Sequence, residues 1–224
     1  PLQCALEKSD QLLLVYCLPD IWFQSTTYGF PKINNIRLDF LLQSLEDLRK
    51  HAQERGGELI FRRGNPTEIV AELAERHRVD GVFAHREHAP EEKGDEDNLR
   101  EKLQVPLRLC DGNSLLKETE LPFSLVDLPQ VFSNFRKQVE KEVQISRPIP
   151  VPKILAPHPQ DCPPGIIPNL EDLGFEPFIR DIRSVYRFAG GETAALSRVQ
   201  HYLWKSHAIK TYKETRNGML KADD

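Results

Sequence analysis

The sequence predicts an α/β fold: a Rossmann-like parallel sheet with helices on both faces, followed by a long connector and the first helices of an α-helical domain. Three observations support this prediction. Short apolar runs of strand length alternate with helical patterns from residue 12 to residue 110. A proline-rich stretch with little periodicity follows. A helical pattern then returns after Gly190-Gly191.

The first predicted strand is the continuous apolar run 12–17, which is typical of a strand buried on both faces of a parallel sheet. A helix follows it. Asn34-Asn35 offers the N-cap, and Gly56-Gly57 ends the helix. Between them, leucines recur at the spacing of a buried helical stripe: Leu38, Leu41, Leu42, Leu45 and Leu48.

Three further strands are predicted at 59–61, 81–85 and 106–110. The helix after the first of these begins at Pro66, because proline is favoured at the first helical position. A charged helix from about Pro90 to Leu103 precedes the last strand. Since a helix separates each strand from the next, the strands are expected to pair in parallel.

The pattern divides the chain into three predicted segments. Residues 1–143 form the α/β domain, which ends in a helix from about Pro129 to Val143. Residues 144–189 form a Pro-rich connector that favours extended backbone, and its spaced apolar residues predict that it wraps the surface. Residues 190–224 begin a helical domain with an apolar stripe from Ala194 to Leu203.

Composition excludes some classes of protein. The formal net charge of -4 gives no broad attraction to nucleic acid. No apolar run reaches the length of a membrane span, and no signal peptide is visible. Four widely spaced cysteines, two of them in predicted strands, are expected to be buried reduced thiols. They indicate an intracellular, reducing compartment, which fits cytosol, nucleus, plastid or mitochondrion equally.

Polar residues gather where the predicted strands end, which is where parallel sheets bind ligands. His85 and His88 suggest a metal, but no third ligand is placed, so no metal site is predicted. The basic groups at 62–63 and 183–187 are more typical of solvated or salt-bridged residues than of nucleic-acid contacts. Gly190-Gly191 is expected to turn the backbone into a helix, because no Lys-Ser/Thr follows it as in a phosphate loop. The residues alone indicate no catalytic group and no enzyme.

Ordered motifs along the whole chain resemble one family. Val15–Asp20 with Trp22-Phe23 resembles a strand and its exit, and Arg37–Leu45 reads Arg-x-x-Phe-Leu-x-x-Ser-Leu. Leu128–Arg136 completes Leu-Pro-x-x-Phe-x-x-Phe-Arg. Further matches are Arg63–Pro66, Arg86-Glu87 with Glu91, Glu92 and Glu96, Leu121–Phe123, Gly190–Leu196 and Tyr212–Leu220. In this order and spacing, the chain resembles the photolyase/cryptochrome family, and within it the DASH-type cryptochromes.

The resemblance implies a blue-light flavoprotein that holds FAD in its helical domain and a methenyltetrahydrofolate antenna in its α/β domain. In the intact family the excited flavin drives repair of pyrimidine dimers in damaged or single-stranded DNA, as a deoxyribodipyrimidine photo-lyase, or serves photoreception. Glu87 matches the antenna-folate pocket, and Tyr212 matches a tyrosine that contacts the flavin diphosphate. The alternative interpretation without a ligand is a charged surface loop for Glu87 and an ordinary half-buried helix tyrosine for Tyr212.

Two departures from the family pattern stand out. No apolar strand with Trp-Phe-Arg-x-Asp-Leu-Arg precedes Pro1, so the sheet is expected to lack its first, central strand. Either the sequence is truncated or incompletely recorded, or a protein partner covers the incomplete sheet. At the other end the helical domain is expected to be truncated, and Lys221 stands where the family leads us to expect glycine. Flavin binding by this chain alone is therefore not expected.

Two other functions stay open. The chain could be a photolyase-derived α/β domain without flavin chemistry that acts as a binding or structural module in a larger assembly. It could also be a nucleotide-binding α/β protein related to universal stress or electron-transfer flavoprotein folds. The ordered motifs favour the light-driven reading over the last of these.

Overall fold

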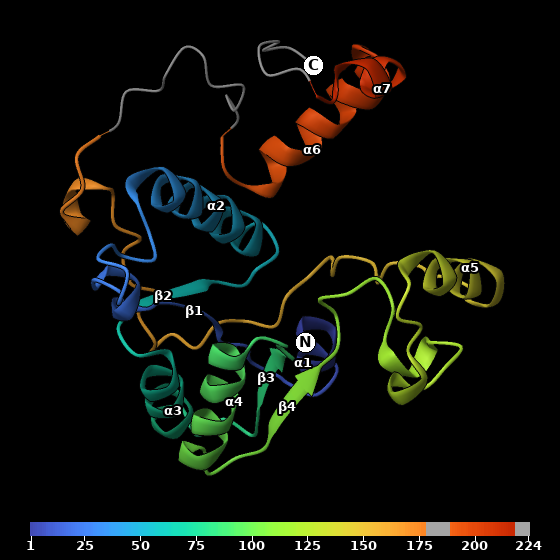
Figure 1. The fold of residues 1–224 in the computed structure, drawn as a ribbon. Coiled ribbons are helices and arrows are strands. Elements are labelled where there is room, and N and C mark those ends of the chain that lie inside the picture. The colour runs from blue at the N-terminus through green and yellow to red at the C-terminus, as the bar shows by residue number, and fades with distance from the viewer. Residues whose placement is uncertain (178–188, 218–224) are drawn as a thin grey trace. The chain divides into compact units, whose positions relative to one another are not determined.

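A computed structural model describes residues 1–177 and 189–217 (Figure 1). The predicted basic group 183–187, Lys221 and the end of the 212–220 motif lie outside the described residues. The chain forms two compact units: residues 1–10 with 67–153, and residues 11–66 with 154–224. They are called unit 1 and unit 2 below, and each is described by itself. The segment boundaries predicted from the sequence at 143 and 189 stay predictions.

Unit 2 is built on one parallel pair of strands. β1 (Leu14–Leu18) pairs with β2 (Leu59–Arg63), with Leu14 opposite Leu59. The crossover between them contains α2 (Asn35–Gln53), which starts where Asn34 Oδ1 accepts the Arg37 N–H at 2.9 Å. The predicted strand, cap and helix are thus confirmed.

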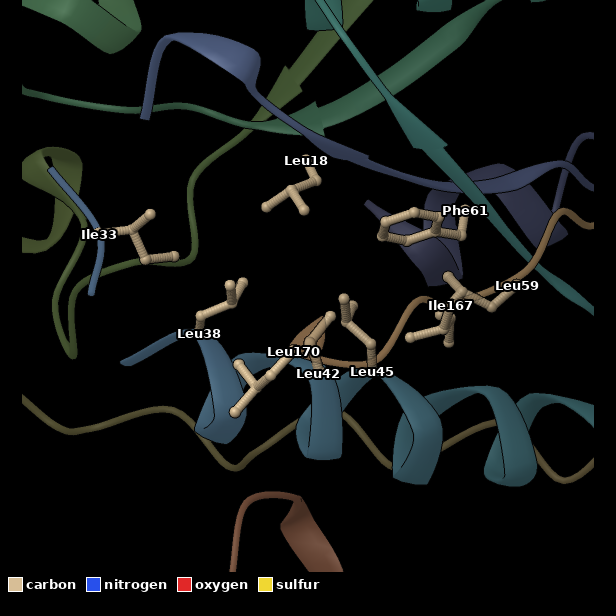
Figure 2. Packing of buried hydrophobic residues seen from close by; sticks show 9 residues of the cluster. All are labelled: Leu18, Ile33, Leu38, Leu42, Leu45, Leu59, Phe61, Ile167 and Leu170. Carbon is tan, nitrogen blue, oxygen red and sulfur yellow. The ribbon is translucent and has the colours of Figure 1, made fainter. Parts of the chain in front are cut away.

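The core of unit 2 lies between α2 and the strand pair (Figure 2). The leucine stripe of α2 faces side chains from the strands and from the segment after residue 154. The buried residues of this core are Leu18, Ile33, Leu38, Leu42, Leu45, Leu59, Phe61, Ile167 and Leu170. Leu41 packs at the margin and Leu48 is exposed, so the stripe that the sequence predicts is narrower in the structure. Burying a leucine side chain contributes about 1.5–3 kcal/mol, so this cluster dominates the stability of the unit.

Unit 1 has a second parallel pair. β3 (Val82–His85) pairs with β4 (Leu107–Cys110), with Val82 opposite Leu107. The helices α3 (Pro66–Arg76) and α4 (Pro90–Lys102) flank β3 in the chain, as predicted. The helix predicted from about Pro129 is α5 (Phe132–Glu142), which begins three residues later, with Val131 as its N-cap. A short helix that was not predicted, α1 (Leu2–Leu6), contacts β3.

The strands confirm the α/β fold with parallel pairing, but they form two two-stranded sheets instead of one. Among the described residues β1 pairs only with β2, and β3 pairs only with β4. Two-stranded sheets are marginal alone, and each is supported here by packed helices.

The connector lies along β2. Leu155 donates its N–H to Arg55 O at 2.8 Å, and the Phe61 N–H donates to Pro164 O at 2.7 Å. Arg49 Nη2 donates to Leu59 O at 2.9 Å and to Pro164 O at 3.3 Å, which ties helix, strand and connector together. The segment from 154 onwards therefore packs on the α/β elements, as its spaced apolar residues predict.

The helices after Gly191 are short. α6 (Glu192–Gln200) continues into one π-helical turn, and α7 (Tyr212–Thr215) follows a 3₁₀ turn. The single turns of the chain are η1 (Asp20–Phe23), η2 (Glu118–Glu120), η3 (Leu125–Asp127), η4 (Glu171–Leu173), η5 (His201–Lys205) and η6 (Ala208–Thr211). No helix in the described part of the chain is long and apolar enough to span a membrane.

The cysteines correct one expectation. None of the four forms a disulfide in the described structure, but only Cys162 is buried; Cys17 and Cys110 are half-buried and Cys4 is exposed. Within the described ranges, the strands that carry Cys17 and Cys110 each pair with a strand on one side only, so their side chains are less covered than those of a fully enclosed sheet. Burial still raises the pKa of the Cys17 thiol to about 11, against a smaller opposing effect of Arg62.

Candidate functional site

Glu87 follows the carboxyl end of β3, the position that the sequence predicts for a ligand. The β3–β4 ladder extends one residue past β3, because the Arg86 N–H donates to Cys110 O at 3.0 Å. The next N–H, that of Glu87, donates to Glu96 Oε1 of α4 at 2.6 Å. The backbone at Glu87 is thus held by both β4 and α4, and its side chain is half-buried.

Asn113 holds the Glu87 carboxylate. Its Nδ2 donates to Glu87 Oε1 at 2.7 Å and to Arg86 O at 3.2 Å. Asn113 stands three residues after the end of β4, so two chain segments that leave neighbouring parallel strands meet at this amide. Both residues come shortly after predicted strands, at 81–85 and 106–110, but the sequence gives no sign of their hydrogen bond.

Arg86 does not neutralise Glu87. Its Nε lies 3.1 Å from Asp111 Oδ1, and both side chains of this ion pair are about half exposed. Arg86 thus pairs with the residue that follows β4, and not with Glu91 or Glu92 in the first turn of α4. In residues 1–177 and 189–217, Glu87 makes no ion pair.

His85 and His88 do not assemble a metal site within the described residues, which contain no group of three candidate ligands. The His85 ring lies against Gly112: a Cβ on Gly112 would lie 2.8 Å from His85 Nδ1. Gly112 therefore lets the imidazole approach the backbone just before Asn113. This contact supports the position of the 111–113 turn.

Tyr212, the second predicted site residue, is the first residue of α7 and is 50% exposed. Its hydroxyl makes no hydrogen bond to another described side chain or backbone group. A free phenol can donate one hydrogen bond to an anionic oxygen. Glu87 and Tyr212 lie in different units, so each is a separate candidate.

A third arrangement, missed by sequence reasoning, joins α2 to α6. The Gly190 N–H donates to Gln43 Oε1 at 2.8 Å, and the Gly191 N–H donates to Ser44 Oγ at 3.0 Å. The Thr193 N–H and hydroxyl donate to the two carboxylate oxygens of Asp47, at 2.9 and 2.7 Å. The side chains of α2 thus cap the N-terminus of α6 from another helix. We call this arrangement the α2–α6 joint.

The joint explains the two glycines. Gly191 has φ +99°, a conformation that L side chains rarely adopt, and a Cβ there would lie 2.7 Å from Asp47 Cβ. A Cβ on Gly190 would overlap Phe40 O. The prediction that Gly190-Gly191 turns the backbone into a helix is therefore confirmed, and close approach to α2 is a second reason for glycine.

Asp47, Thr193 and His51 lie together but do not form a nucleophilic triad. The Thr193 hydroxyl donates to Asp47, so it accepts at its oxygen from His51 Nε2, 2.9 Å away. Arg55 Nη1, which can only donate, lies 3.4 Å from His51 Nδ1, an arrangement that favours the tautomer with its proton on Nε2. In that tautomer Nε2 is a donor to Thr193 and not a base for it. Hydrogen bonds from the Thr193 backbone and hydroxyl lower the pKa of the Asp47 carboxyl.

Comparisons with known proteins point to the same family as the sequence motifs. The family model for DNA photolyase matches residues 1–154. The chain is 40% identical to a Cryptochrome DASH of Gloeobacter violaceus, covering 100% of this chain and 45% of that protein. It is 40% identical to "Cryptochrome DASH, chloroplastic/mitochondrial" of Arabidopsis thaliana, covering 98% and 39%. The crystal structure of a Synechocystis cryptochrome superposes with a TM-score of 0.91 at 36% identity, covering 100% and 47%. The chain thus spans less than half the length of these relatives.

Proposed function

This chain belongs to the DNA photolyase family and is similar along its whole length to DASH cryptochromes, and from this premise we propose that it serves as the antenna part of a blue-light flavoprotein. The observation that carries the proposal is Glu87: a carboxylate at the carboxyl end of β3, held by an amide and left without a cation among the described residues. Such a carboxylate is suited to a ligand that presents N–H groups.

The ligand proposed for Glu87 is methenyltetrahydrofolate. Its amino-pyrimidine edge presents N–H donors, which a carboxylate oxygen with two lone pairs can accept. When bound, the folate supplies light absorption in the near-ultraviolet and blue. Glu87 is only half-buried, so most of the affinity must come from apolar contact along the rest of the ligand.

The proposed role of Tyr212 is a hydrogen bond to the diphosphate of FAD. When bound, the flavin supplies the light-driven electron transfer of the family. One phenol cannot offset the entropy that a dinucleotide loses on binding, so Tyr212 contributes orientation, and binding by this chain alone is not expected. For the whole protein we propose repair of pyrimidine dimers in damaged or single-stranded DNA, or photoreception.

We also propose a protein segment that pairs with the open edge of β1. The connector bonds β2 on the side away from β1, whereas the described residues supply no strand to the other side of β1. A strand that leaves backbone groups unpaired is a template for another strand. The proposed compartment is intracellular and reducing, because none of the four cysteines forms a disulfide in the described structure.

A second function is favoured by the contrast between the two candidates. Glu87 is part of a formed hydrogen-bond arrangement, whereas Tyr212 is half exposed and its hydroxyl has no partner among the described residues. The alternative proposal is therefore a photolyase-derived α/β domain that binds or supports without flavin chemistry, as a module of a larger assembly.

A chromophore assay on the natively purified protein tests both proposals. Absorbance is recorded from the near-ultraviolet through the blue, and the small molecules released on denaturation are then identified. Flavin with folate supports the blue-light flavoprotein. Folate without flavin supports an antenna module alone. Protein that releases neither, even after incubation with both compounds, overturns the light-driven proposal and leaves the structural module.

A further inference from the structure

We propose that Asn113 is a positioning residue for Glu87: its amide holds one carboxylate oxygen and leaves the other to accept N–H donors from an amino-pyrimidine edge. The proposal rests on the proposed folate function of Glu87. It adds a residue that the sequence pattern does not single out, and it assigns that residue an action through Glu87 instead of direct contact with the ligand.

The first support is the geometry of the amide. An asparagine NH₂ group has two hydrogens. Here one goes to Glu87 Oε1 at 2.7 Å and the other to Arg86 O at 3.2 Å, so both are used on neighbouring acceptors. Because Arg86 O belongs to the backbone bonded to β4, the amide is anchored to a rigid element. The direction of the Glu87 carboxylate is then set from β4.

The second support is charge. A lysine or arginine beside Glu87 would hold the carboxylate and also neutralise it. Asn113 holds it with a neutral group, and the adjacent cation, Arg86, is taken up by Asp111 at 3.1 Å. Exposed ion pairs contribute little to stability, so the main effect of the Arg86–Asp111 pair is to keep the guanidinium away from Glu87. The carboxylate keeps its full attraction for donors on a ligand.

The third support is that backbone and side chain are held separately. Glu96 Oε1 accepts the Glu87 N–H at 2.6 Å, whereas Asn113 holds only the carboxylate. Removing the amide at 113 therefore frees the side chain and leaves the backbone in place. Asn113 is itself exposed, so substitutions there create no cavity.

The simpler alternative is that Asn113 only shapes the turn after β4. Asn113→Asp separates the two roles, since aspartate keeps the shape and turn preference of asparagine but has no donor and places a second negative charge beside Glu87. Asn134→Asp in α5 is the matched control: it makes the same change at an exposed position of unit 1 with no side-chain partner in the described structure.

The experiment measures the Kd of 5,10-methenyltetrahydrofolate for the native protein and for single variants, with melting temperatures in parallel. Pterin and lumazine compete in the same assay, because lumazine lacks the 2-amino group. We expect Asn113→Ala to weaken folate binding about tenfold and Asn113→Asp to weaken it more. We also expect both variants to lose the preference for pterin over lumazine, with unchanged melting temperatures and with Asn134→Asp like the wild type.

The two proposals fail in different ways. If the wild type binds folate and Asn113→Asp binds it equally well with the same pterin preference, the positioning role is overturned and the antenna function stands. If the wild type binds no folate, both are overturned. If the Asn113 variants lose affinity together with melting temperature while pterin preference is kept, Asn113 is a turn residue and the positioning role is again overturned.

Discussion

Glu87 and Asp47 are both carboxylates that receive hydrogen bonds from another element, yet their surroundings differ. Both oxygens of Asp47 accept from Thr193, and the acid closes the α2–α6 joint. Glu87 has one oxygen bonded to the Asn113 amide and the other without a partner in the described chain. A carboxylate whose acceptors are filled by its own protein stabilises the fold. Among the residues that the structure describes, Glu87 is bonded on one oxygen only, which leaves the other for the ligand that we propose.

The largest expected effect comes from breaking the joint at its backbone. Gly191→Ala places a Cβ against Asp47 in a conformation that alanine rarely adopts. We expect a loss of about 3 kcal/mol in the free energy of unfolding, measured by urea denaturation. Gly94→Ala is the control: it lies in α4 with open space around it and should stabilise by about 0.5–1 kcal/mol. Equal effects at the two glycines would contradict the proposed close approach to α2.

The ligand side of the comparison is tested by Glu87→Gln. Glutamine keeps the size but loses the charge, so we expect folate affinity to fall about tenfold or more, with unfolding free energy unchanged within about 0.5 kcal/mol. The measurement is equilibrium folate binding followed by absorbance. Glu92→Gln, exposed in the same region, should bind like the wild type. Loss of stability without loss of folate affinity would show that Glu87, like Asp47, stabilises the fold and does not bind the ligand.

Asp47→Ala should show the reverse behaviour. It removes the acceptors for the first turn of α6, and capping residues contribute about 1–2 kcal/mol. Faster amide hydrogen exchange at Thr193 and along α6, with unchanged folate affinity, is the expected result. Protection of α6 equal to that of the wild type would show that the apolar contacts of the helix suffice.

The smallest expected effect is a pH dependence of the joint. The pKa of Asp47 is lowered from its ordinary value of 3.8 by hydrogen bonds from Thr193. The stabilisation is therefore full above that value and is lost as the pH falls through the lower folded pKa. Urea denaturation of wild type and Asp47→Asn between about pH 6 and pH 3 should give curves that converge only at the acid end. If the difference in unfolding free energy between the two proteins grew as the pH fell, the pKa of Asp47 would be raised by folding and not lowered.

Local pattern predicted much of this fold. The apolar runs, the leucine stripe of α2 and the cap at Asn34 need only neighbours in sequence, and the structure confirms them. α1 was missed because five residues carry too little periodicity to read. The division into two strand pairs agrees with the expectation that the sheet lacks its central strand, but the pairing itself depends on which strands meet in space.

The sites divide in the same way. Position at a strand end and the family motifs single out Glu87, but its bond to Asn113 joins residues 26 apart. The joint spans 146 residues between Asp47 and Thr193, and only the paired glycines left a sign of it. Side-chain partners at such separations follow from packing, which no local spacing encodes.

The bond from Phe61 to Pro164 has a consequence for how this chain tolerates rearrangement. Through this bond the connector covers the outer edge of β2, which would otherwise be open to pairing with strands of other molecules. Gly165, with φ +76° and no room for a Cβ beside Phe61 O, fixes the point where the connector turns away from β2. A Gly/Ser-rich linker of equal length would span the same distance and leave that edge bare. Circular permutation or domain swapping through this segment should therefore give a protein that aggregates through the edge of β2, even where the leucine core is intact.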